Sequence, residues 1–187
     1  MRRNIISIIL IVCIALIFSA CSNYNKEESG LVYGQEDAPI EIVNYTSFQC
    51  PDCVTLHEKL HDSLKKYIDN GDVKFIEKPI DIKRFEFDDV IYKHMTEEQA
   101  YDFEYLSKIY ETQVQWREFK SESEVLELLE LGADENSDNV KDLKEITKEK
   151  DNLEIKEVPT MLINGEIISN SISVDEFENK INLLLNK

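Results

Sequence analysis

Two cysteines, Cys50 and Cys53, stand three residues apart where the sequence pattern changes from strand to helix. Residues 40–45 (IEIVNY) are rich in β-branched and aromatic residues and predict a strand. From residue 51 to about 68, apolar residues recur at spacings of mostly three and four, which predicts an amphipathic helix. Residues 73–76 (VKFI) predict a second strand. The cysteine pair therefore opens the helix of a strand–helix–strand unit.

The position of the pair at a helix start favours redox chemistry. The unpaired N–H groups and the dipole at a helix N-terminus stabilise a thiolate on Cys50. Pro51 fits the first helical position, where its missing N–H costs nothing. Cys53 lies one turn further along the same face, so it can resolve a mixed disulfide that forms on an exposed Cys50. The alternative is a structural disulfide, but so short a loop constrains the unfolded chain little.

A metal site is a second alternative, because Cys50, Cys53, His57 and His61 have the spacing C-x2-C-x3-H-x3-H. Along one straight helix, Cys50 and His61 would lie about 16 Å apart. Zinc ligands lie within about 2.0–2.3 Å of the metal, so these four side chains cannot share one ion. A pair of them could do so only with ligands from another segment. We expect no metal and no cofactor, and we expect both histidines on a solvent-facing or half-buried flank of the helix.

The first twenty residues differ from the rest of the chain. Arg2 and Arg3 precede an almost wholly apolar run of 16 residues, 5–20 (IISIILIVCIALIFSA), and polar sequence follows at once. This arrangement is typical of a secretory signal peptide, and the run is short for a hydrocarbon core about 30 Å thick. The sequence therefore predicts a signal peptide at 1–20, a polar tether at 21–30 and a folded domain at 31–187.

The end of the apolar run, Phe18-Ser19-Ala20-Cys21, resembles the lipobox of bacterial lipoproteins. The resemblance implies that Cys21 is lipidated and becomes the new N-terminus, although leucine is commonest where Phe18 stands. An uncleaved anchor helix is the alternative. Either interpretation places the domain outside the cytoplasm, and we expect it on the extracytoplasmic face of the cell membrane, anchored by lipid.

The charge of the mature chain limits its partners. Without residues 1–20 it has 19 Lys and Arg against 38 Asp and Glu, a formal charge of 19 − 38 = −19. A chain with this much negative charge is repelled by nucleic acid and by anionic lipid headgroups. We therefore expect no nucleic-acid partner. A covalent lipid is then the expected means of holding it at the membrane.

The second half of the chain predicts a helical segment followed by a return to strands. Residues 83–152 read as mostly helical, with a capping box at Thr96 to Gln99 and one apolar face extending to Tyr110. Asn164-Gly165 is a strong hairpin signal. The other expected elements are helices at 121–131, ended by Gly132, and 137–149, strands at 160–163 and 166–169, and a last helix from Ser173 to about Leu185.

Two motifs together resemble a known family. Residues 38–53 (APIEIVNYTSFQCPDC) resemble the opening of DsbA-like proteins of the thioredoxin superfamily. Glu157-Val158-Pro159-Thr160, followed by MLINGE, resembles the family's second signature, where a cis-proline stands beside the dithiol. The helical segment between them is similar to the family's inserted domain. The resemblance implies an α/β thioredoxin fold with a helical insertion at about 83–152.

The resemblance also implies roles for individual residues. Cys50 matches the nucleophile and Cys53 the resolving cysteine. Pro159 matches the cis-proline, with Val158 presenting its backbone to an extended substrate, although the sequence alone also allows an ordinary proline at a strand start. Pro51 and Asp52 stand where the family tunes its redox potential. Strong oxidases often have histidine in place of Asp52, and a carboxylate there should oppose the thiolate.

The implied reaction is thiol–disulfide exchange with exported proteins. We expect an oxidase, reoxidised by a membrane partner that passes electrons to quinone. The alternative is a thioredoxin-like reductase, kept reduced by a membrane electron carrier and serving apocytochromes or other oxidised proteins. A third hypothesis is a non-catalytic or metallochaperone module with the same fold.

Overall fold

A computed structural model of the 187-residue chain describes residues 28–80, 82 and 87–186. The apolar run at 5–20 and the candidate lipidation site Cys21 lie outside the described residues, so both stay predictions. Within the described part, no helix combines the length and the apolar character that a membrane crossing requires.

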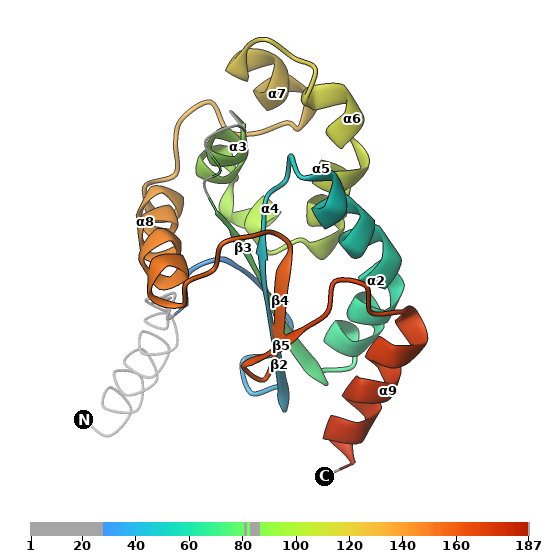
Figure 1. The fold of residues 1–187 in the computed structure, drawn as a ribbon. Helices are drawn as coiled ribbons and strands as arrows, with labels where there is room; N and C mark the ends of the chain where they lie inside the picture. Colours follow the sequence, from blue (N-terminus) through green and yellow to red (C-terminus); the bar gives the residue numbers. More distant parts are fainter. Residues whose placement is uncertain (1–27, 81, 83–86, 187) are drawn as a thin grey trace, which may run out of the picture.

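The centre of the molecule is a five-stranded mixed sheet in the order β1-β3-β2-β4-β5 (Figure 1). The neighbours β2 and β3 run parallel and are joined by helix α2, whereas the other three pairs are antiparallel. The strands are β1 (Leu31–Tyr33), β2 (Ile40–Thr46), β3 (Val73–Pro79), β4 (Thr160–Ile163) and β5 (Glu166–Ile168). This is the α/β class that the sequence predicts, with β1 as an additional short edge strand.

Helices cover both faces of this sheet. Helices α2 (Pro51–Asp69) and α9 (Val174–Leu185) lie together on one face, and α8 (Ser137–Asn152) lies on the other (Figure 1). All the helices between β3 and β4 belong to one continuous insertion. Besides α8 they are α3 (Asp88–His94), α4 (Glu97–Ala100), α5 (Phe103–Glu111), α6 (Gln113–Trp116) and α7 (Glu122–Leu128).

Strand β2 serves both faces because successive side chains of a strand point in opposite directions. Asn44 and Thr46 are buried and contact Glu77 and Tyr110 on the face of α2 and α5. Tyr45, between them, points to the other face, where its hydroxyl donates to Glu149 of α8 at 2.5 Å. The last residues of β2 therefore join both helical layers just before the dithiol.

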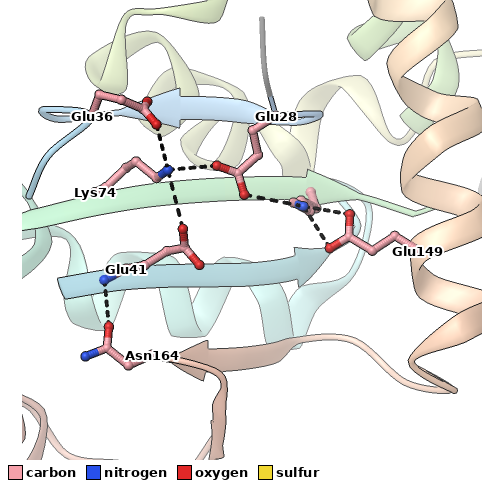
Figure 2. Close-up of polar contacts among 7 residues, drawn as sticks. Glu28, Glu36, Glu41, Lys74, Glu149 and Asn164 are labelled. Atoms are coloured by element: carbon pink, nitrogen blue, oxygen red, sulfur yellow. Dashed lines mark hydrogen bonds and ion pairs between the residues drawn. The ribbon is translucent and has the colours of Figure 1, made fainter.

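The face of the sheet under α8 is held by buried lysines of β3. Lys78 donates to both carboxylate oxygens of Glu149, at 2.8 and 2.7 Å. Figure 2 shows that Lys74 points toward three carboxylates from separate segments. They belong to Glu28, Glu36 and Glu41, at 2.8, 3.3 and 3.4 Å. These ion pairs connect the chain before β1, strand β2 and the insertion to the same central strand.

Local turn signals are confirmed. Helix α2 ends at Asn70 and Gly71, where Gly71 has φ of 77° and the Asp72 N–H donates to the Tyr67 carbonyl at 2.9 Å. Asn164 and Gly165 both have positive φ, 48° and 79°, as the hairpin turn between β4 and β5 requires. The Asn164 side chain also accepts the N–H of Glu41 in β2 at 2.8 Å (Figure 2).

Two helix predictions were wrong in extent. The helix expected from Thr96 to Tyr110 is broken in two, because Asp102 accepts the N–H of Glu104 at 2.9 Å and thereby caps a new helix, α5. The helix expected to end at Gly132 ends at Leu128 instead. Glu130 takes the left-handed conformation, with φ of 54°, and the Leu131 N–H closes onto the Leu126 carbonyl at 2.9 Å.

Candidate active site

Cys50 caps the N-terminus of α2, as the sequence predicts. Its N–H donates to the Ser47 carbonyl at 3.1 Å, and its own carbonyl accepts the N–H groups of Cys53 and Val54, each at 3.1 Å. Pro51 occupies the first turn, where no N–H is needed. Both thiols are free, so the structure represents the dithiol form.

The two sulfur groups differ in ionisation. The hydrogen bond from the Cys53 thiol lowers the pKa of Cys50 to about 6, helped by the N–H groups of Cys53 and Asp52 and opposed by burial and by the Asp52 charge. Burial, followed by the hydrogen bond to Cys50, raises the pKa of Cys53. At neutral pH the pair therefore holds its negative charge on Cys50. The Asp52 carboxylate acts in the expected direction but is outweighed.

The expectation of an exposed Cys50 was wrong. The residue is 5% exposed, against 1% for Cys53. The difference in access between them is small, because Cys50 packs within the hydrophobic core at the helix start. Little of Cys50 is therefore open to a reacting partner in this structure.

The loop before β4 lies beside Cys50. The Val158–Pro159 peptide bond is cis, which agrees with the resemblance, and the Cys50 Sγ lies 3.9 Å from the Val158 carbonyl oxygen. Asn170 donates to the Pro159 carbonyl at 2.5 Å, and Lys59 of α2 donates to the Asn170 carbonyl at 3.0 Å. This second contact, which the sequence did not indicate, ties the loop to α2.

A shallow pocket of about 360 Å³ adjoins the same loop. It lies between the first turns of α2 and the segment after β5, beside the predicted substrate-presenting residue Val158. Its lining residues are Asp52, Thr55, Leu56, Lys59, Glu157, Val158, Pro159, Asn170 and Ser171.

A buried polar network lies beneath Cys53. The Thr46 hydroxyl contacts the Cys53 thiol and lies 2.6 Å from the Tyr110 hydroxyl, which donates to Glu77. Glu77 is fully buried and also accepts from the Asn44 amide at 2.9 Å. Burial raises the pKa of Glu77 to about 7, although the hydrogen bonds from Tyr110, Asn44 and Thr46 act in the opposite direction. A carboxyl group that titrates near neutral pH is thus linked to the resolving thiol.

The sequence did not identify Glu77, because the predicted strand ended at Ile76. Extending its alternation by one residue would have found it, since Val73 and Phe75 are buried on the same face. Tyr110 was predicted only as part of an apolar helix face.

The expectation for His57 was also wrong. It is buried, with Nε2 3.0 Å from the Ser107 hydroxyl and its ring stacked 4.6 Å from that of Tyr110. Burial, and then the neighbouring His61, lower the pKa of His57 to about 3. His61 is half-buried, as expected. Over the described residues, no three His, Cys, Asp or Glu side chains gather in a way that could hold a metal ion.

Comparison with known proteins identifies the family. The family model described as Thioredoxin matches residues 26–182. The chain belongs to this thioredoxin family. Its α/β fold with inserted helices is the one that the DsbA-like resemblance implies.

Three relatives illustrate the likeness. Disulfide bond formation protein D of Bacillus subtilis (strain 168) is 38% identical over 45 residues, which are 24% of this chain and only 20% of that relative. A conserved protein of unknown function from Enterococcus faecalis V583 matches with a TM-score of 0.71 and 23% identity, over 83% of this chain and 90% of its own. The α-DsbA1 of Wolbachia pipientis matches with a TM-score of 0.63 and 17% identity, over 83% and 90%. The two solved structures show that the fold is shared.

Proposed function

We propose that this protein is an extracytoplasmic thiol–disulfide oxidoreductase that exchanges disulfides with exported proteins through Cys50 and Cys53. The observation that supports this most directly is the opposite displacement of the two pKa values, lowered for Cys50 and raised for Cys53. An exchanging dithiol requires one sulfur that leaves and attacks as a thiolate and one that stays protonated until it resolves the intermediate.

In the oxidase direction, a substrate thiolate attacks Cys50 Sγ of the disulfide and forms a mixed disulfide. The Cys53 sulfur leaves with the bonding electrons and takes up a proton. A second substrate thiolate then attacks the substrate sulfur and releases Cys50 as a thiolate. The substrate has lost two electrons and gained a disulfide, and the protein has become the dithiol.

The low pKa of Cys50 favours the oxidase over the reductase. A stabilised thiolate stabilises the reduced protein, and this makes its disulfide more oxidising. The Cys50 value of about 6 lies between the values of about 7 and about 3.5 that are characteristic of thioredoxin and of DsbA. We therefore expect an oxidant of intermediate strength.

A reductase is the second candidate, and Asp52 is the observation that favours it. Its charge opposes the Cys50 thiolate, which makes the disulfide harder to reduce than it would be with a neutral neighbour. A reductase of this kind would be kept reduced by a membrane electron carrier.

The backbone beside Cys50 offers a docking edge for the substrate. The Val158 carbonyl next to the sulfur supports pairing with an extended peptide, whose cysteine would then approach Cys50. Pro159 would hold this edge in place.

For the location of the protein, we propose lipidation of Cys21 and a tether that reaches the domain near Glu28, which is paired to Lys74. The lipid would keep the domain at the outer face of the cell membrane. There it could meet exported clients and a membrane redox partner, either a quinone-linked reoxidant or a reductant. No cofactor is needed for the exchange.

The reduction potential of the purified full-length protein tests the proposal. The protein is equilibrated in graded glutathione buffers, and free thiols are counted by alkylation. A potential near about −120 mV would support a strong oxidase, and one near about −270 mV would support the reductase. Catalysis of disulfide formation in a reduced, unfolded test protein should vanish in Cys50→Ala. Catalysis that survives in this variant would disprove the dithiol mechanism.

A further inference from the structure

Asp88 is a buried acid of the insertion that contacts the loop leading into the dithiol. It is 2% exposed, and its Oδ1 accepts the N–H of Gln49 at 3.0 Å. The Gln49 side chain returns the contact, since its Oε1 accepts the N–H of Phe87 at 2.8 Å. Gln49 immediately precedes Cys50, so these two hydrogen bonds hold the carboxyl group beside the nucleophile.

The second oxygen of this carboxyl group is removed from water and gains no hydrogen bond in exchange within the described part of the chain. Asp88 Oδ2 is buried, and among the described residues it has no hydrogen-bond partner. The Ser47 hydroxyl is the neighbouring polar group, but it too is buried without a well-formed hydrogen bond. A buried, unpaired carboxylate oxygen is costly, and a proton on it removes that cost.

Among the described residues, the charged and titratable groups around Asp88 do not relieve its charge. Asp89 on the same helix points to Lys93, at 2.8 Å, and Asp142 of α8 accepts from Tyr92, at 3.1 Å. No lysine or arginine of the described part forms an ion pair with Asp88. Burial raises the pKa of Asp88 to about 7, the nearby Ser47 hydroxyl and the Gln49 N–H lower it, and the charges of Asp89 and Cys50 raise it again.

We propose that Asp88 is a positioning residue that takes up a proton when the Cys50–Cys53 disulfide is reduced, and so makes the strength of the oxidant depend on pH. This inference rests on the proposed disulfide exchange. It follows from the location of a buried carboxyl oxygen, free to accept a proton, next to the one sulfur that becomes negative on reduction.

The step balances with two substrate thiols. The disulfide and the Asp88 carboxylate react with two thiols to give the Cys50 thiolate, the Cys53 thiol, the Asp88 carboxylic acid and one substrate disulfide. Two electrons pass from the thiol sulfurs to the protein disulfide. Of the two protons released, one binds Cys53 Sγ and the other binds Asp88, so the charge of the site stays at −1 in both states.

The test compares Asp88→Asn with Asp89→Asn. An asparagine at 88 can still accept the Gln49 N–H but has neither the charge nor the proton site. We expect its Cys50 thiolate, followed by ultraviolet absorbance, to titrate about one unit lower, a tenfold larger acid dissociation constant. Near pH 7, proton uptake per disulfide reduced should fall toward one. Asp89→Asn removes an acid that is paired with Lys93 and does not contact Gln49, so it should shift both readouts much less than Asp88→Asn does.

If both variants give the wild-type thiolate titration and proton uptake, the role of Asp88 is disproved. The same holds if Asp89→Asn shifts them as much as Asp88→Asn does. A wild-type protein that shows no reversible equilibrium with glutathione would instead disprove the proposed function. If Asp88→Asn does not fold, the NMR chemical shift of the Asp88 side-chain carboxyl carbon, measured in isotope-labelled wild-type protein, tests the proposal instead. It must differ between the disulfide and dithiol forms near pH 7, and an unchanged shift overturns the proposal.

Discussion

The sulfur of Cys50 lies 3.9 Å from the carbonyl oxygen of Val158, although 108 positions separate the two residues in the sequence. The contact joins the first turn of α2 to the loop before β4. A peptide aligned along this loop would present its cysteine to Cys50, which contacts the loop, and not to Cys53, whose raised pKa keeps it protonated.

Cys53→Ala, incubated with a client protein that carries a disulfide, should therefore accumulate a mixed disulfide. The Cys50 thiolate attacks the client disulfide and displaces one client thiolate, and no Cys53 thiol remains to release the adduct. Mass spectrometry under non-reducing conditions measures the adduct. Cys50→Ala is the matched control, and we expect at least about tenfold less adduct with it, since the Cys53 thiol is rarely ionised. Equal amounts from both variants would contradict the assignment of the nucleophile.

Asp52→Asn should make the protein more oxidising, because it removes a charge that opposes the Cys50 thiolate. Asp52 is exposed and its effect is screened by solvent, so we expect only about a threefold shift of the equilibrium with glutathione toward the dithiol. Asp52→His should shift it further in the same direction. Asp62→Asn, on the same helix but away from the dithiol, serves as the control. A shift toward the disulfide would refute this electrostatic account.

Glu77→Gln should stabilise the protein above pH 7. The raised pKa of Glu77 means that the folded state binds more protons than the unfolded state between about pH 4.5 and 7, so unfolding free energy falls as pH rises through this window. At most this loss is about 3 kcal/mol. The glutamine removes this loss, and its amide can donate to Asn44 Oδ1, which has no hydrogen-bond partner within the described part of the chain.

Urea unfolding at about pH 4 and about pH 8 measures this effect, with Glu58→Gln as an exposed control on α2. We expect a gain of about 1–3 kcal/mol at the higher pH and little change at the lower one. If Glu77→Gln is less stable than wild type at pH 8, the carboxylate is stabilising and our sign is wrong.

His57→Phe should change the pH dependence of stability on the acid side of neutral pH. The lowered pKa of His57 means that the folded state binds fewer protons than the unfolded state between about pH 3 and 6.5, so stability is lost as pH falls through this window. Phenylalanine fills the stack on Tyr110 without taking up a proton. We expect the unfolding free energy at neutral pH to fall by about 1 kcal/mol, because the hydrogen bond to Ser107 is lost. We also expect the unfolding free energy of the variant to fall less steeply than that of wild type as the pH is lowered. His61→Gln should change the pH dependence in this range much less, because burial is the larger cause of the lowered pKa of His57.

Local signals allowed much of the fold to be predicted. The start of α2 at Pro51, the turn at Gly71 that follows the helix, and the hairpin at Asn164 each depend on the conformational preference of one or two residues. The break at Asp102 was missed because a capping residue competed with a continuous apolar face. Strand β1 has three residues and is held by pairing with β3, which a short window of sequence does not reveal.

The dithiol and the cis-proline were predictable because both belong to contiguous motifs. The buried acids near the two cysteines could not be predicted in this way. Glu77 and Asp88 are unremarkable acids in an acidic chain until tertiary packing removes them from water. Burial of His57 depends equally on α5, which lies far along the sequence.

The double contact of Glu149 with Lys78 and Tyr45 has a consequence for the engineering of this protein. Excising the helical insertion would remove Glu149, the nearer of the two acids paired with Lys78, and would expose Lys78 together with Tyr45, one residue from Thr46, which touches Cys53. Helix α8 therefore supplies one wall of the sheet core beside the cysteine pair, and we expect a variant without the insertion to lose stability at this face.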